Sequence, residues 1–342
     1  MTDRQATSAT MKHLRAYLFP WGVQKPTADE IVDFARTAEE LGFEAVHIPW
    51  HYTMPKSKSF ADFGTRYLLD PTVVVPMIVS ATKRLKVGLE FVVPTLHPFH
   101  WAQYFASLDR ASGGRTLACP VLGWWDEDYK VGMVNPKQRG RRMDEALSTM
   151  VKLWAGEKIE KPGEFWDCSG LELDPKPVQQ PYPMWIGGGD KSLDRAARWA
   201  QALYPLVPTP KEVAETWVPS LRHAEKYGRK LELAIVSYVL ATDEAKWLRQ
   251  YAYPRLLARI NGMTHAEARE RIDDQTLVQP DKSLMIGTNE QCADRLRALL
   301  DAGADHIVID FYMHGWETPG FGKEQMERFV KEIVPLCATV KA

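Results

Sequence analysis

Three consecutive glycines stand at a place in the chain where a phosphate group could bind. Gly187, Gly188 and Gly189 end a short apolar segment, and the residues that follow have the composition of a helix. Glycine lets the backbone approach a ligand closely, and the amino end of a helix offers N–H groups with partial positive charge. Lys191 and Ser192 could add a charge and a hydroxyl. The pattern indicates a phosphate site, although a plain glycine-rich turn has the same sequence.

A histidine follows the second predicted strand. His51 comes three residues after the apolar segment 43–48 (FEAVHI). An imidazole at the end of a buried strand can donate a hydrogen bond or carry a proton near neutral pH. We therefore place His51 in the predicted catalytic set. The alternative is a solvated loop histidine, and His47, inside the same segment, is expected to pack within the strand.

A carboxylate interrupts the third predicted strand. Glu90 lies between Leu89 and Phe91 in an otherwise apolar run. Burying a carboxylate is costly unless it is paired. Glu90 therefore either faces a site and belongs to the catalytic set, or forms a buried ion pair with Arg15 or Lys86.

Aromatic and basic residues follow the fourth predicted strand. Trp124 and Trp125 could pack on a flat ring or line a substrate site, and at least one of them is expected to do so. Arg139 and Arg142 could reach a phosphate from the next helix, or belong to its solvated surface. The acidic run 126–128 is expected to be a solvated loop.

These residues are separated by alternating strand and helix patterns. The predicted strands are residues 13–19, 43–48, 85–93, 116–122, 184–187, 202–206, 231–240 and 305–311. Thr27 with Glu30, and Thr288 with Gln291, form capping boxes that begin two of the helices. Near-continuous apolar strands such as residues 85–93 are typical of a parallel sheet covered on both faces.

Eight βα units predict an α/β fold, a (β/α)8 TIM barrel whose site lies at the carboxyl ends of the strands. An open doubly wound sheet is the rival, but its G-x-G-x-x-G is absent after the first strand. Residues 1–11 read as a flexible tail, and 12–342 as one domain. The segments 156–180 and 261–283 break the repeat and are expected to be insertions over the carboxyl-terminal face of the barrel.

Composition excludes several classes of function. Lys and Arg total 43 against 44 for Asp and Glu, a balance that offers no electrostatic argument for nucleic acid or an anionic membrane. The four cysteines are far apart and are expected to be reduced thiols of a cytoplasmic protein. No apolar run approaches the length of a membrane helix, and no His spacing predicts a metal site.

Five stretches together resemble the luciferase-like monooxygenase family. They occur in the family's order, and they are 107–115 (SLDRASGGR), 123–127 (GWWDE), 139–145 (RGRRMDE) with Leu153 and Trp154, 175–181 (PKPVQQP) leading to 185–188 (WIGG), and 302–305 (AGAD). The resemblance implies that the family's flavin phosphate lies near Gly188, that His51 matches the family's rim histidine, and that Glu90 faces the flavin. It also implies that Trp50 could occupy the histidine register, so Trp50 joins the predicted catalytic set.

The chain departs from the family pattern around the expected flavin site. Trp50 stands before His51 where the family often has an acidic residue, residues 120–124 read PVLGW in place of GVGxGW, and residues 201–204 replace a frequent DGW. These departures bear on which flavin and which substrate are bound.

The resemblance implies a monooxygenase that uses reduced FMN (FMNH2) and O2 to oxidise a small organic substrate. A separate NAD(P)H-dependent flavin reductase and a homo-oligomer are the implied partners. The alternative on the same fold is hydride transfer with the deazaflavin coenzyme F(420). A second alternative is a flavin-binding protein without catalysis.

Overall fold

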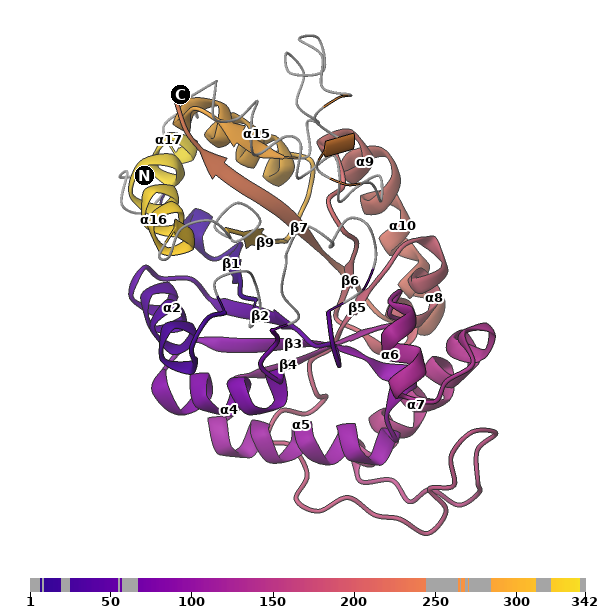
Figure 1. Ribbon diagram of the computed structural model, residues 1–342. Coiled ribbons are helices and arrows are strands. Elements are labelled where there is room, and N and C mark those ends of the chain that lie inside the picture. Colours follow the sequence, from indigo (N-terminus) through magenta and orange to yellow (C-terminus); the bar gives the residue numbers. More distant parts are fainter. Residues whose placement is uncertain are drawn as a thin grey trace.

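Eight parallel strands form a closed ring at the centre of the molecule (Figure 1). The computed structural model describes residues 7, 9–19, 25–54, 56, 67–243, 264, 266–267, 270, 284–311 and 321–338. The strands run in the order β4-β3-β2-β1-β9-β7-β6-β5, and a bridge between Ala118 and Met184 joins β4 to β5. Their bounds are β1 Leu14–Tyr17, β2 Ala45–Pro49, β3 Lys86–Val92, β4 Thr116–Val121, β5 Trp185–Gly187, β6 Ala202–Tyr204, β7 Glu232–Ala241 and β9 His306–Asp310. The predicted barrel is confirmed.

A ninth strand, β8 (Met285–Gly287), lies off this ring and pairs in parallel with the end of β7. The sequence prediction does not contain it. Three residues are too few to show a period of two, and the Gly at its end reads equally well as part of a turn.

Helices surround the ring on its outer side (Figure 1). The two predicted capping boxes are confirmed, because Thr27 and Thr288 each accept a hydrogen bond from the third residue of their helix. The longer helices are α2 Ala28–Glu40, α4 Pro71–Ala81, α5 Pro98–Ser112, α7 Arg139–Ala155, α15 Asn289–Asp301 and α16 Phe321–Arg328. The shorter ones are α6 Asp126–Val131, α8 Leu193–Trp199, α9 Pro210–Glu212, α10 Val218–Ser220 and α17 Val334–Ala338.

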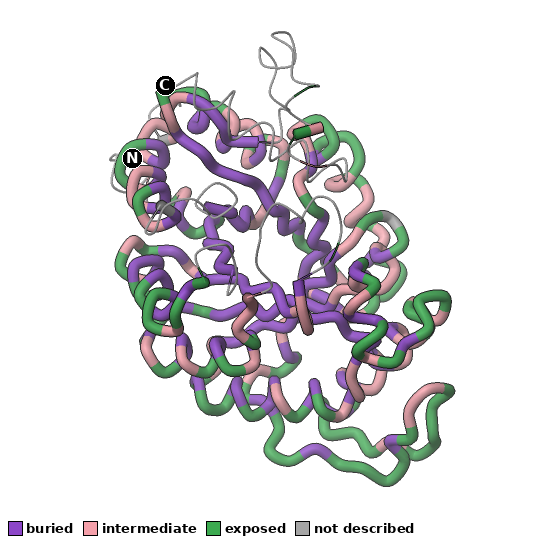
Figure 2. The backbone as a smooth tube through the Cα atoms, in the orientation of Figure 1, coloured by how far each residue is buried: buried purple, intermediate pink, exposed green. Residues whose placement is uncertain are grey.

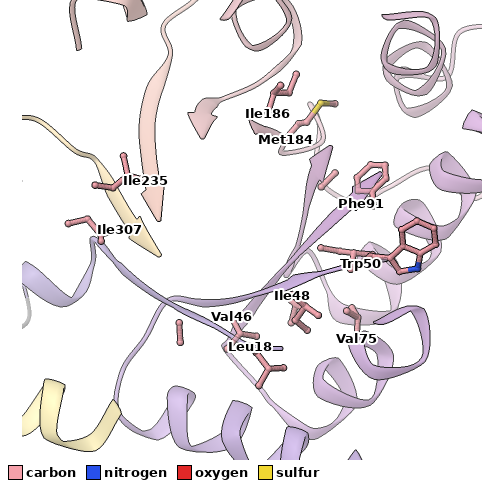
Figure 3. Close-up of a cluster of buried hydrophobic side chains, with 14 of the residues drawn as sticks. Leu18, Val46, Ile48, Trp50, Val75, Phe91, Met184, Ile186, Ile235 and Ile307 are labelled. Atoms are coloured by element: carbon pink, nitrogen blue, oxygen red, sulfur yellow. The ribbon is translucent and has the colours of Figure 1, made fainter. Parts of the chain in front are cut away.

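The core has two parts, because alternate residues of each strand face opposite sides of the sheet. On β7, Leu233 and Ile235 pack outward against the helices, whereas Ala234 and Val236 face into the barrel. The strands are buried apart from their ends, where the first residues of β3 and β7 are exposed, and most exposed residues lie on the helices and loops (Figure 2). Figure 3 shows part of the outer cluster, where residues of the first strands lie beside α4. The outer cluster fixes the strands, and the inner one carries the polar groups described below.

The segment 156–180 lies against the outer helices rather than over the carboxyl ends of the strands, which differs from the prediction. Glu145 of α7 accepts hydrogen bonds from three successive backbone N–H groups of residues 164–166. At the far end of the segment, Arg110 of α5 donates to the Lys176 carbonyl at 2.7 Å. The composition of the segment resembles that of a lid, but its backbone is tied down by Glu145 of α7 and by the buried Asp109 of α5, which accepts from the Val178 and Gln179 N–H groups at 2.7 and 2.9 Å. Most of the second predicted insertion, 261–283, lies outside the described residues.

The end of the predicted tail is part of the fold. Residues 9–11 are helical, and Met11 is buried in the outer core. Residues 1–6 and 8 lie outside the described residues. Within the described part of the chain, no helix is long and apolar enough to span a membrane.

Candidate functional site

His51 and the buried Asp128 form a pair at the carboxyl end of β2. The His51 Nδ1 lies 2.6 Å from the Asp128 Oδ2, and the Asp128 side chain is fully buried. The other carboxylate oxygen accepts a hydrogen bond from the Tyr52 backbone at 3.0 Å. The imidazole stacks on the Trp125 indole with 3.5 Å between ring centroids. Carboxylate and indole together fix the position and plane of the ring.

Asp128 reaches His51 because α6 begins directly after Trp125. Its neighbour Glu127 accepts a hydrogen bond from the Lys56 backbone at 3.0 Å, so the helix holds the loop after β2 at two points. The predicted solvated loop at 126–128 is therefore wrong for Asp128. Sequence reasoning missed this residue because His51 and Asp128 are 77 positions apart, a separation that no local pattern reveals.

The neighbouring tryptophans have separate roles. Trp50 does not accompany His51, since its ring packs in the outer core against Trp101, 5.2 Å between centroids, and its indole N–H donates to Asp70 at the start of α4. Trp50 and His51 therefore face opposite sides of the sheet, and Trp50 leaves the proposed catalytic set. Trp124 is 61% exposed and meets Trp125 edge-on, whereas Trp125 is buried against His51.

The glycine turn has three differently constrained positions. A Cβ at Gly187 would lie 2.8 Å from Val121 of β4, and one at Gly188 would collide with the Ser192 hydroxyl. Gly188 also has a φ of +130°, which favours glycine. Gly189, in contrast, is exposed, and a Cβ there would meet nothing within 4 Å. Open space at this turn therefore lies beside Gly189.

Two side chains follow the turn before α8 begins. Lys191 is exposed and Ser192 is buried, in a 3-10 turn over Asp190–Ser192. The Ser192 N–H bonds back to the Gly189 carbonyl at 2.8 Å. The turn is thus internally ordered, with the Lys191 ammonium on its solvent side.

The two predicted arginines point to different places. Arg139 is exposed at the start of α7, next to Gly140, whose carbonyl contacts Arg195 of α8 at 3.3 Å. Arg142 donates to the Pro94 carbonyl at 3.2 Å and lies 4.5 Å above the Trp166 ring. Arg139 is therefore beside the element that follows the glycine turn, whereas Arg142 secures the segment 156–180 and does not fit a phosphate role.

Glu90 faces the inside of the barrel, as one of the two alternatives predicts. Its carboxylate accepts a hydrogen bond from the Tyr17 hydroxyl of β1. Arg15 and Lys86, the other predicted partners, both pair with Glu44 at 2.8 Å. Burial raises the pKa of Glu90 to about 7, and the nearby Asp310 carboxyl adds to that increase, while Tyr17 and Tyr204 oppose it. Glu90 is therefore a titratable group in the physiological range.

His47 packs inside the barrel, as the sequence predicts. Its ring stacks on Trp185 with 5.0 Å between centroids. A Cβ on Gly88 of the next strand would lie 2.9 Å from this imidazole, so glycine is required there. Burial holds the pKa of His47 well below its usual range, and Arg15 and His306 add to that effect. His47 is consequently neutral and serves packing.

The described residues contain no cluster of three or more His, Cys, Asp or Glu side chains that could hold a metal ion. A closed α/β barrel with polar groups gathered at the carboxyl ends of the strands is the arrangement of barrel enzymes.

The chain belongs to the luciferase-like monooxygenase family, whose model matches residues 11–306. It is 23% identical over 329 residues to the FMNH(2)-dependent dimethylsulfone monooxygenase of Pseudomonas putida, covering 88% of this chain and 86% of the relative. It is 25% identical to the F420-dependent glucose-6-phosphate dehydrogenase of Gordonia bronchialis, covering 90% and 92%. The structure of an F420-dependent secondary alcohol dehydrogenase superposes with a TM-score of 0.74 at 18% identity, covering 95% and 98%.

These findings make the chain an oxidoreductase with the family's barrel. They divide the relatives between two cofactors, FMNH2 and F420. The identity of the cofactor therefore has to be argued from the site.

Proposed function

We propose that this protein is a monooxygenase that uses reduced FMN and O2 to oxidise a small organic substrate. The observation that carries the proposal is the His51–Asp128 pair, stacked on Trp125 at the carboxyl end of the barrel. A histidine oriented by a buried carboxylate is a common arrangement for proton transfer at an active site. The similarity to an FMNH2-dependent monooxygenase supports the same choice.

The residues present fit a flavin. The open side of Gly189, with Lys191 and Arg139 exposed nearby, suits a phosphate group, because cations and close backbone approach both favour an anion. Gly187 and Gly188 shape the turn, and the buried Ser192 hydroxyl packs against Gly188. Trp125 supplies a flat aromatic surface for a ring system.

The reduced flavin would supply the electrons for the reaction with O2, and the protein supplies position and protons. We propose that the His51 imidazole, held at Nδ1 by Asp128, exchanges a proton with a ligand through Nε2. Asp128 acts through His51 as a positioning residue, because its carboxylate accepts the Nδ1–H and so favours the imidazole tautomer in which Nε2 is a proton acceptor. Trp125 covers the imidazole face and excludes water from it.

The proposed reaction needs two further participants. A small organic substrate is oxidised, and a separate NAD(P)H-dependent flavin reductase delivers the FMNH2. We propose a homo-oligomer in the cytoplasm as the working form. No nucleic acid or membrane partner is part of the proposal.

Hydride transfer with coenzyme F(420) is the second candidate, since relatives of this activity match over 90% of the chain at similar identity. Anaerobic titration separates the two. We expect purified protein to bind FMNH2, as followed by quenching of its tryptophan fluorescence, with little response to reduced F(420). Tight binding of F(420) alone would favour hydride transfer over the FMN-dependent monooxygenase. If the protein bound neither cofactor, both proposals would fail.

A further inference from the structure

A donor and an acceptor face each other inside the barrel without completing a hydrogen bond. The Glu90 Oε2 accepts from Tyr17, but Oε1 has no hydrogen-bond partner among the described residues. The Tyr204 hydroxyl of β6 lies close enough to the carboxylate to lower the pKa of Glu90, yet it too lacks an aligned partner within this part of the chain. Both side chains are buried, at 8% and 2% exposure.

The Glu90–Tyr204 pair lies between the His51 side of the site and the glycine turn at 187–189. The Glu90 backbone carbonyl accepts a hydrogen bond at 2.7 Å from Trp50, the residue before His51. The Tyr204 carbonyl accepts one at 3.3 Å from Gly188 of the glycine turn. Since β3 and β6 are not neighbours in the sheet, the two side chains meet across the barrel. A ligand that spans from the turn to His51 would pass this pair.

Buried polar groups that lack partners are rare in proteins, because each costs about 1–3 kcal/mol. Beside the Glu90–Tyr204 pair and the buried His47 and Asp310, the inward-facing cluster is apolar and aromatic. Its members toward the carboxyl ends of the strands include Phe19, Met54, Trp125, Tyr238 and Leu240. An apolar lining with a few convergent polar groups is typical of a site for a small organic molecule.

We propose that Glu90 and Tyr204 bind the hydroxyl group of a largely apolar organic substrate. The substrate O–H would donate to Glu90 Oε1, and the Tyr204 hydroxyl would donate to the substrate oxygen. One hydroxyl satisfies both unpartnered atoms, whereas an ether can only accept. The inference rests on the proposed function, because it assigns the substrate class of the same site.

The proposal also predicts how pH acts on binding. The titratable groups that face Glu90 are Tyr17 on β1, His47 on β2, Cys119 on β4, Tyr204 on β6 and Asp310 on β9. Burial keeps Cys119 and Tyr204 neutral by raising their pKa values well above the ordinary range. Glu90, with a pKa of about 7, is the group that changes between pH 6 and pH 8. The accepting carboxylate predominates at pH 8, so hydroxyl binding should weaken as the pH falls.

Calorimetric titration with benzyl alcohol, 1-hexanol and their methyl ethers tests this inference, with and without bound FMN. At pH 8 we expect the wild-type protein to prefer each alcohol over its ether by at least about tenfold. Glu90→Gln and Tyr204→Phe should reduce that preference to about threefold or less. Tyr182→Phe is the matched control, since this buried hydroxyl is bonded to Thr116 at 2.8 Å in the outer core and should leave the preference unchanged.

Equal or undetectable binding of alcohols and ethers by the wild-type protein overturns the inference, as does an undiminished preference in both folded variants. The comparison of pH 6 with pH 8 needs no variant and so does not depend on their folding. If FMN fails to bind while the alcohol preference is present, the proposed cofactor fails and this inference stands. If FMN binds normally and the preference is absent, only this inference fails.

Discussion

At the scale of single residues, neighbouring glycines are not equivalent. Gly188 has a backbone conformation that favours glycine and packs against Ser192, whereas Gly189 faces open space. A substitution at Gly188 would therefore disturb folding as well as ligand binding. Only Gly189 offers a clean test of phosphate binding at this turn.

We predict that Gly189→Val raises the dissociation constant for FMN at least about tenfold, because its side chain would fill the space beside the turn. Thermal unfolding of this variant should match the wild type. Gly188→Val should instead lower the unfolding temperature, through strain and the collision with Ser192. Unchanged FMN affinity in Gly189→Val would remove the phosphate from this turn.

Glu90 should leave a signature in the pH dependence of stability. Its pKa in the folded protein is about 7, above the ordinary value of 4.5, so the folded state binds more protons than the unfolded state between these pH values. Stability from this group is therefore present at low pH and is lost as the pH rises toward 7, by about 3 kcal/mol at most.

Glu90→Gln should remove this dependence. Urea unfolding at pH 5 and pH 8 should show that the variant gains stability relative to wild type at the higher pH. Parallel stability curves for the two proteins would mean that Glu90 is ionised at both pH values.

At the scale of elements, the apolar patterns and capping boxes predicted the features that depend on nearby residues, which are the strands and the starts of helices. The eight barrel strands and the starts of α2 and α15 follow from residue periodicity and from Thr27 and Thr288. The segment 210–227 is a series of α, π and 3-10 turns, which fits the missing N–H of Pro219. Contacts between distant segments escaped prediction: Asp128 with His51, Tyr204 with Glu90, and Glu145 with the segment 156–180.

The last of these contacts can be tested by proteolysis. Glu145→Ala removes the acceptor of three backbone N–H groups, so the segment 156–180 should be cut faster by trypsin than in wild type. FMN affinity should not change, because the segment lies against α5 and α7. Glu160→Ala, an exposed residue of the same segment, is the control. Loss of FMN binding in the folded Glu145→Ala variant would place this segment at the site after all.

At the scale of the whole molecule, the ring of strands closes through contacts between segments far apart in sequence. β1 pairs with both β2 and β9, which joins the two ends of the chain. After a single cut within 156–180, the two fragments should therefore remain associated and unfold in one transition, as followed by size-exclusion chromatography and calorimetry. Two separate transitions would mean that the halves fold independently.

The whole molecule also explains why the site could be only partly predicted. His51, Glu90 and the glycines lie at or inside the carboxyl ends of strands, and strand patterns locate such positions. The groups that orient them come from other strands and from α6, so only the closed barrel reveals them.

The most direct test of the central claim follows protein-bound reduced FMN after mixing with oxygenated buffer, without substrate. The overall conversion of FMNH2 and O2 to FMN and hydrogen peroxide is balanced, so the rate of peroxide release reports how well the site holds the reacting groups. We predict that His51→Ala binds FMN normally but releases peroxide about 10²-fold faster than wild type, since proton control at a positioned histidine is typically worth 10²–10⁴-fold. Equal release rates in the two proteins would contradict the role of the His51–Asp128 pair.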